Sequence, residues 1–151
     1  MTAQAQKQTE RRRDDPEGAF TLVELLVVLA IIGLIAALVA PQVLRYLGSA
    51  RVETTKAQLK NIGSALELYY LDSGKYPSPD IGLNALVAAP NDGSLWNGPY
   101  LKSVAALKDA WGNKFAYEQA GEPLAILVKS LGRDGKPEGQ GLDADLEYKV
   151  Q

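Results

Sequence analysis

The chain has 151 residues, contains no cysteine and no histidine, and carries 16 basic and 18 acidic side chains. This length is typical of one compact domain, and the near-neutral charge provides no electrostatic surface for nucleic acid. The missing cysteine excludes a disulfide scaffold, a thiolate zinc site and a cysteine nucleophile. The missing histidine removes the side chain that most often acts as a catalytic base or binds a transition metal.

The apolar residues are distributed unevenly along the chain. Residues 1–19 are polar, with four basic and four acidic side chains, and bury too little apolar surface to fold alone. Of the next 25 residues, 20–44, twenty are apolar, whereas residues 45–151 have an ordinary composition. We therefore divide the chain into a leader at 1–19, a membrane-type segment at 20–44 and an α+β domain at 45–151.

The stretch from Phe20 to Ala40 predicts a membrane-spanning helix. Its 21 residues would extend about 31 Å as a helix, close to the ~30 Å of hydrocarbon in a bilayer. Three consecutive arginines, Arg11–Arg13, precede the span and predict a cytoplasmic N-terminus with the C-terminal domain on the other side. A cleavable secretory signal is the alternative, but the apolar run is longer than in most signal peptides and carries an acid near its start.

Glu24 is the only ionisable side chain in this stretch. A carboxylate is costly at the centre of a bilayer and less so near the headgroups. Two interpretations stay open from the residues alone: Glu24 reaches the headgroups, or it has a partner.

A second helical pattern follows Pro41, where apolar residues recur at spacings typical of one face of an amphipathic helix. Gly74 and Pro77 predict the end of this helix. The simplest model is one helix from about residue 21 to 72, in which Pro41 removes a backbone donor and kinks or loosens the helix. The predicted buried face consists of Val52, Leu59, Ile62, Leu66 and Tyr69.

The rest of the domain predicts a small sheet. Residues 73–112 are rich in Pro, Gly, Asn and Asp and indicate loops, with a short helix near 83–88. The region 113–151 contains strand-like segments at 114–118, 124–129 and 146–150, and Gly121 indicates a hairpin between the first two. The expected fold is therefore α+β, with the helix packed on an antiparallel β-sheet. The hydrophobic core of such a domain is small, so the fold needs an additional stabilising link.

The loop after residue 129 is the best candidate for that stabilising link. Asp134, Asp143 and Asp145 place three carboxylates within twelve residues, among four glycines that allow carbonyl groups to turn inward. Oxygen ligands without histidine or cysteine select Ca²⁺ over zinc or copper. The spacing is not that of an EF-hand. A solvated acidic turn is the alternative, because Asp and Gly are common in loops.

The segment FTLVELLVVLAIIGLIAALVAPQV resembles the N-terminus of type IV pilin-like proteins. Counted from Phe20, the acid of that family falls at position five, Glu24, and its proline at position twenty-two, Pro41. The motifs KAQLKNIGSALELYYLDSGKYPS, GLNAL, WNGPYLK, DAWGNKFAYE, SLGRDG and DADL look like the major pseudopilin of type II secretion, general secretion pathway protein G. The resemblance covers residues 20–148.

This resemblance implies a filament subunit rather than an enzyme. A prepilin peptidase would cut after Ala19 and N-methylate Phe20; because the family usually has Gly before the Phe, a cut after Gly18 is the alternative. Subunits of the family polymerise from the bacterial inner membrane into a periplasmic pseudopilus, which drives folded proteins through an outer-membrane secretin. The implied partners are other copies of the chain, minor pseudopilins, the inner-membrane assembly platform, the peptidase and the secretin, with no nucleic acid.

The resemblance also assigns roles to single residues. In a filament, Glu24 would be neutralised by the Phe20 amine of a neighbouring subunit, which offsets the desolvation of the carboxylate and sets the axial register. Pro41 would let the helix lose hydrogen bonds locally when it leaves the bilayer. The loop near the C-terminus would bind Ca²⁺ in place of the disulfide of many pilins. Its implied ligands are the carboxylates of Asp134, Asp143 and Asp145 and the carbonyl of Leu131, with Ser130 as a further candidate.

Two other classes of protein compete with this interpretation. A type IV pilin or a minor pseudopilin would share the N-terminal segment but differ in the loop, and a true pilin would be expected to carry a C-terminal cysteine pair. A membrane-anchored enzyme would have to use the acidic loop as a catalytic metal site, although the sequence presents no evident base or nucleophile for it.

Overall fold

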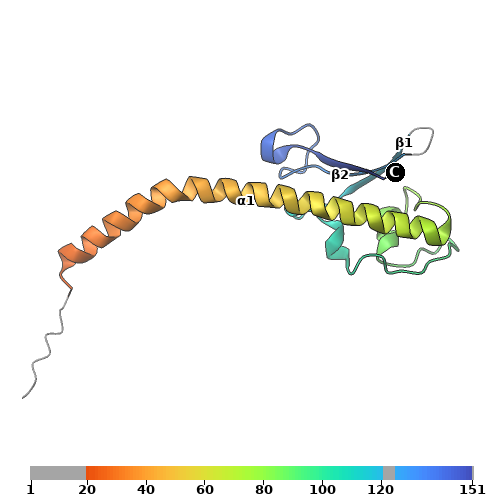
Figure 1. Cartoon of the computed structure of the whole chain (residues 1–151), viewed down its shortest axis with the longest axis horizontal. Coiled ribbons are helices and arrows are strands. Elements are labelled where there is room, and N and C mark those ends of the chain that lie inside the picture. Colours follow the sequence, from red (N-terminus) through yellow and green to blue (C-terminus); the bar gives the residue numbers. More distant parts are fainter. Residues whose placement is uncertain (1–19, 121–124, 151) are drawn as a thin grey trace, which may run out of the picture. The chain divides into compact units, whose positions relative to one another are not determined.

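A computed structural model describes residues 20–120 and 125–150 (Figure 1). The chain divides into two compact units, residues 1–40 and residues 41–151, which are described separately. In chain order the elements are α1 (Leu22–Ser73), the short 3-10 helices η1 (Gly82–Leu86) and η2 (Val104–Leu107), the strands β1 (Ala116–Ala120) and β2 (Ala125–Ser130), the 3-10 helix η3 (Gly141–Asp143) and the strand β3 (Leu146–Val150).

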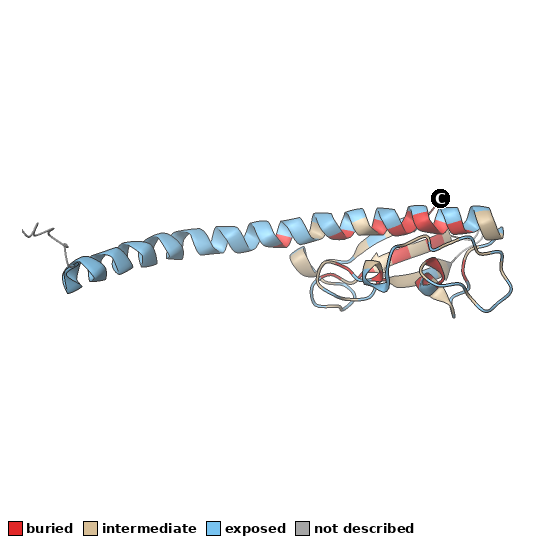
Figure 2. Cartoon of the chain, turned by 90° about the horizontal axis from the view of Figure 1, so that it is seen from below, coloured by how far each residue is buried: buried red, intermediate tan, exposed pale blue. Residues whose placement is uncertain are grey.

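The described part of the first unit consists of residues 20 and 21 and the beginning of α1. Residues 22–40 are helical, and every one of them is exposed, as the pale blue part of the helix in Figure 2 shows. By length and composition, α1 is the one helix in the described ranges that could cross a membrane. The apolar side chains of residues 22–40, the described helical part of this unit, therefore form no core of their own.

In the second unit α1 continues through Pro41 and becomes buried on one side. Of the five residues predicted to face the domain, four are buried and Val52 is partly buried. The spacing of the apolar residues therefore identified the correct face of the helix. The buried positions of this part of α1 are Gly48, Thr55, Leu59, Ile62, Gly63, Ala65, Leu66 and Tyr69.

The three strands form one antiparallel sheet in the order β1-β2-β3. Partly buried and buried residues alternate along β2, where Ile126, Val128 and Ser130 are the buried ones. At Gly63 of α1 an added Cβ would overlap the Tyr148 ring of β3, so helix and sheet approach each other as closely as glycine allows. The predicted α+β fold, a long helix packed on a small antiparallel sheet, is confirmed.

The observed strands differ slightly from the predicted segments. β1 begins at Ala116 because Lys114 forms an isolated bridge with Lys108 instead of joining the ladder. β2 begins at Ala125, and β3 covers the predicted residues 146–150. β1 and β2 pair antiparallel as expected, while Gly121 of the predicted hairpin lies outside the described residues.

Side-chain hydrogen bonds fasten the long connection between helix and sheet. The Trp96 indole N–H donates to the Ala85 carbonyl at 2.8 Å, and the Tyr100 hydroxyl donates to the Asp72 carboxylate at 2.7 Å. The helix expected near residues 83–88 is the 3-10 helix η1, which buries Leu83, Ala85 and Leu86. This connection therefore supplies part of the core and ties it to the end of α1.

Candidate assembly segment and calcium loop

The N-terminal end of α1 is capped by its own side chains. The Thr21 hydroxyl accepts the Glu24 N–H at 3.2 Å, and Oε2 of Glu24 accepts the Thr21 N–H and hydroxyl at 3.0 Å each. This reciprocal pattern is a capping box, and the spacing Thr-x-x-Glu is its sequence signature. Glu24 thus has a role within its own helix that neither sequence interpretation included. The two hydrogen bonds that Glu24 accepts from Thr21 both end on Oε2, so Oε1 can accept a further donor.

The other predicted processing and assembly residues lie at the two ends of the apolar stretch. Phe20 precedes α1 and is 80% exposed. Pro41 is an exposed residue inside the helix. Ala19, the expected cleavage position, lies outside the described residues.

A buried carboxylate, Asp109, lies at the base of the predicted calcium loop and is only 5% exposed. It accepts hydrogen bonds from the Ser130 hydroxyl at 2.6 Å, the Trp111 N–H at 3.0 Å and the Asn113 N–H at 2.8 Å. The Asn113 side-chain amide donates to the Gly132 carbonyl at 2.8 Å. The turn at residues 109–113 is therefore fastened to the end of β2, where the loop begins.

This network gives the Ser130 side chain a structural role. Ser130 is fully buried, and its hydroxyl is bonded to Asp109. Sequence reasoning missed Asp109, although the motif DAWGN carries a signal: an aspartate that accepts main-chain N–H groups two and four residues later is typical of a tight turn.

Across the loop, Arg133 and Asp143 form a two-pronged ion pair. Nε of Arg133 donates to Oδ1 of Asp143 at 2.8 Å, and Nη2 donates to Oδ2 at 2.9 Å. These hydrogen bonds to Arg133 lower the pKa of Asp143 and raise the pKa of Arg133. Both oxygens of one predicted calcium ligand are thus held by a cation of the chain itself, which the sequence analysis did not anticipate.

The remaining predicted ligands make local contacts. Oδ1 of Asp134 accepts the Lys136 N–H at 3.1 Å, and Oδ2 of Asp145 accepts the Glu138 N–H at 3.3 Å. Leu131 follows directly after β2. In the part of the chain that the structure describes, no three acidic side chains converge into a group that could hold a metal ion.

The backbone of the loop is nevertheless folded tightly where these residues lie. Gly132 has a φ of +65°, and a Cβ there would stand 2.5 Å from the Asp143 carbonyl. A Cβ at Gly139 would overlap the same carbonyl. Carboxylate and carbonyl oxygens on a glycine-rich loop are the donors that calcium prefers. The donor atoms of the loop are therefore of the type that binds Ca²⁺. Each of the three predicted carboxylates, however, accepts a hydrogen bond from another group of the chain.

Two family models match the chain. Residues 42–149 match the model described as Type II secretion system (T2SS), protein G, and residues 16–40 match the prokaryotic N-terminal methylation motif. The type II secretion system core protein G of Pseudomonas aeruginosa is 41% identical over 134 residues, which cover 86% of this chain and 93% of that protein. The protein of the same name from Vibrio cholerae is 37% identical, covering 84% of this chain and 88% of its own length.

A solved structure agrees with these relatives. The crystal structure of the major pseudopilin from the type 2 secretion system of enterohaemorrhagic Escherichia coli matches with a TM-score of 0.53 and 28% identity, over 66% of this chain and 86% of that one. These matches favour a core pseudopilin over a type IV pilin or a minor pseudopilin. The chain therefore belongs to the type II secretion system protein G family, the family of the major pseudopilin.

Proposed function

We propose that this chain polymerises into the periplasmic pseudopilus of a type II secretion system, whose growth drives folded proteins across the outer membrane. One observation carries the proposal: residues 22–40 form an apolar helix that is exposed along its whole length and has Glu24 as its only charge. Such a helix needs lipid around it before assembly and neighbouring subunits around it afterwards. Its role is structural and not catalytic, in keeping with a family of structural subunits.

We place the chain in the bacterial inner membrane as a single-pass protein. The arginines at 11–13 favour a cytoplasmic N-terminus, which puts the domain at residues 45–151 in the periplasm. The match of residues 16–40 to the methylation motif supports cleavage after Ala19 and methylation of Phe20 by a prepilin peptidase. Minor pseudopilins, the assembly platform and the secretin complete the set of proposed partners.

Within the filament, Glu24 is proposed to accept the Phe20 amine of a neighbouring subunit. The capping box occupies Oε2 with the Thr21 N–H and hydroxyl, so Oε1 is available for the incoming amine. The cap fixes the carboxylate at the start of the helix, which limits the positions at which a neighbour can pair with it. Pairing removes an uncompensated charge from an apolar environment and thereby selects one axial register.

The proposal is tested by producing the full chain together with the remaining components of the secretion system. Pseudopili sheared from the cells are collected, and the N-terminus of the subunit is identified by mass spectrometry. We expect a filament built of chains that begin with methylated Phe20. A subunit that keeps residues 1–19, or that never enters a filament, would contradict the proposed function.

We further propose that the loop at residues 130–145 binds Ca²⁺. The carboxylates of Asp134, Asp143 and Asp145 and the carbonyl of Leu131 would hold the ion, with the Ser130 carbonyl as a further candidate. When bound, calcium supplies a cation that ties the start of the loop to its end. For Asp143 to take part, its two oxygens must leave the Arg133 guanidinium, which now holds both of them.

Thermal unfolding of the full chain in a mild non-ionic detergent tests this site. At a calcium concentration of 100 times Kd, binding to the folded state alone stabilises it by about 2.7 kcal/mol, so the unfolding temperature should rise with calcium and fall with chelator. Asp145→Asn should reduce this difference, while Asp80→Asn, an exposed aspartate outside the loop, should leave it intact. Identical unfolding with calcium and with chelator would refute the site.

A further inference from the structure

A groove of about 360 Å³ lies in the second unit, between α1 and the loop at residues 130–145. On one side of it Leu142 packs on Gly48, where an added Cβ would stand 2.6 Å from a Leu142 methyl group. Leucine and tryptophan side chains form its walls, three arginines surround it, and none of its lining residues is acidic. We call it the basic groove; its walls include Leu47, Trp111 and Leu142, and its arginines are Arg45, Arg51 and Arg133.

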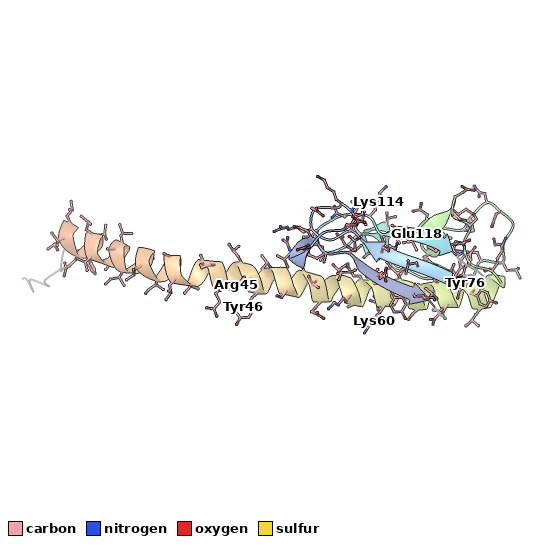
Figure 3. All side chains as sticks on the ribbon, turned by 90° about the horizontal axis from the view of Figure 1, so that it is seen from above. Arg45, Tyr46, Lys60, Tyr76, Lys114 and Glu118 are labelled. Carbon is pink, nitrogen blue, oxygen red and sulfur yellow. The ribbon has the colours of Figure 1, made fainter. Side chains whose placement is uncertain are left out.

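Two of these arginines have no acidic partner in the described part of the chain. Arg133 pairs with Asp143, but no carboxylate of the described residues lies within 4.0 Å of Arg45 or Arg51. Figure 3 shows the Arg45 side chain projecting away from α1 into open space. A partner that fits the groove therefore has to bring acidic and apolar side chains together.

The second unit also carries exposed acids outside its ion pairs. Among the described residues, six exposed carboxylates of this unit have no lysine or arginine within 4.0 Å. Three of them belong to the loop proposed to bind Ca²⁺, whereas Glu67 stands on α1 within one helical turn of two exposed leucines. Glu67 is therefore the acid with the surroundings that the groove requires. The six acids are Glu67, Asp80, Asp134, Glu138, Asp145 and Glu147.

The end of α1 combines acidic and apolar side chains on one face. Residues four apart on a helix are neighbours, so Glu67 lies beside Leu71, and Leu68 lies beside Asp72. Leu68 is 53% exposed and Leu71 is 76% exposed. Asp72 accepts the Tyr100 hydroxyl through Oδ2, which leaves Oδ1 as an acceptor. We call Glu67, Leu68, Leu71 and Asp72 the acidic helix face, and its charge and apolar surface complement those of the basic groove.

We infer that the basic groove of one subunit receives the acidic helix face of a second copy of the chain, an inference that rests on the proposed polymerisation. A helix that lays its apolar side chains into a groove is a common mode of protein recognition. Arg45 and Arg51 pair with Glu67 of the second copy, because guanidinium groups bind carboxylates through two parallel hydrogen bonds. Leu71 of the second copy packs against Leu47 and Trp111.

This contact is head-to-tail, because the two surfaces occupy different parts of α1. Leu47 and Leu71 are about 36 Å apart along the helix at 1.5 Å per residue. Each bound copy therefore leaves one groove and one helix face free, and such contacts build an open filament unless they close into a ring. A contact between two grooves would instead place arginines against arginines, which like charges oppose. The contact lies wholly within the second unit and adds to the pairing proposed for Glu24.

Disulfide cross-linking tests the inference, because the chain contains no cysteine of its own. The full chain with Leu47→Cys and Leu71→Cys is produced together with the remaining components of the secretion system, and the sheared pseudopili are oxidised. A disulfide requires Cα atoms within about 7 Å, so these two cysteines bridge different copies only. We expect a ladder of dimers, trimers and longer multimers on a non-reducing gel, which neither single-cysteine variant produces.

The matched control is Leu47→Cys/Lys114→Cys. It carries the same number of cysteines, with the second at an exposed position outside both surfaces (Figure 3), and should remain monomeric. Pseudopili that assemble from the Leu47/Leu71 variant without a ladder would overturn the inference and leave the proposed function intact. A ladder of equal intensity in the control, or dimers from either single-cysteine variant, would overturn it as well. Absence of pseudopili from the unmodified chain would contradict the proposed function itself.

Charge reversal provides a second measurement if the cysteines disturb assembly. Arg51→Glu and Glu67→Arg should each lower the yield of pseudopili about tenfold, because like charges then face each other across the contact. Combining the two reversals exchanges the charges and should restore the yield. Lys60→Glu, which reverses the charge of another exposed residue of α1, should leave the yield unchanged. A combined variant that assembles no better than the single ones would overturn the inference.

Discussion

The two units of the chain differ in where their apolar side chains find contacts. Residues 22–40 are all exposed, whereas Leu66, Tyr69, Leu86 and Val128 of the second unit have no exposed surface. The first unit therefore depends on lipid or on neighbouring subunits, while the second carries its own core. Substitutions at residues 22–40 should impair filament assembly without unfolding the domain. Substitutions in the core of the second unit should lower the free energy of unfolding of the domain.

The largest effect is expected from Glu24→Ala. Removing the carboxylate leaves the Phe20 amine of the neighbour unpaired in an apolar environment, and breaking a buried ion pair in this way costs about 3 to 5 kcal/mol. The yield of sheared pseudopili, measured by immunoblot, should fall more than a hundredfold, while thermal unfolding of the domain stays unchanged. Glu53→Ala on the same helix is the control, because Glu53 is an exposed residue whose carboxylate pairs with Lys56 of its own helix. Normal filament yield would show that Glu24 has no partner.

A pair of leucines tests the contrast between the units directly. Leu66 is fully buried in the second unit, and Leu29 is 61% exposed in the first. Leu66→Ala should lower the free energy of unfolding by about 3 kcal/mol, because it leaves a cavity in the core. Leu29→Ala should leave unfolding of the domain unchanged. Both are measured by denaturant unfolding of the full chain in detergent, and equal effects would refute the division into two units.

Asp109→Ala should destabilise the second unit by about 2 kcal/mol. It removes the acceptor of the Trp111 and Asn113 N–H groups and of the Ser130 hydroxyl, and buried donors without acceptors are costly. Asp80→Ala, at an exposed position, provides the comparison. Because Asp109 anchors the base of the loop, calcium affinity measured by titration calorimetry should fall as well. Unchanged stability would mean that water replaces the carboxylate without loss.

The features that could be predicted from sequence are those set by local periodicity. The helix repeat identified the buried face around Leu66, and the strand-like character of residues 146–150 identified β3, because both patterns arise from neighbours along the chain. The contacts of the loop are of another kind. Asp109 and Ser130 are 21 residues apart and Arg133 and Asp143 are ten apart, so their pairing depends on how the intervening chain folds. The composition of the loop identified its acidic residues, but it did not predict that Arg133 pairs with Asp143.

Arg133→Gln should give the smallest effect. It tests whether Arg133 and Ca²⁺ compete for the Asp143 carboxylate. The Arg133 guanidinium now holds both oxygens of Asp143, so calcium bound at the proposed site would have to displace it. Without that competitor, calcium affinity measured by titration calorimetry on the detergent-solubilised chain should rise about two- to fivefold, since exposed ion pairs contribute little free energy. Lys136→Gln removes the same charge from the same loop, where only the main-chain N–H of Lys136 contacts Asp134. If both variants raise the affinity equally, the effect is general electrostatics; if only Arg133→Gln raises it, Asp143 belongs to the calcium site.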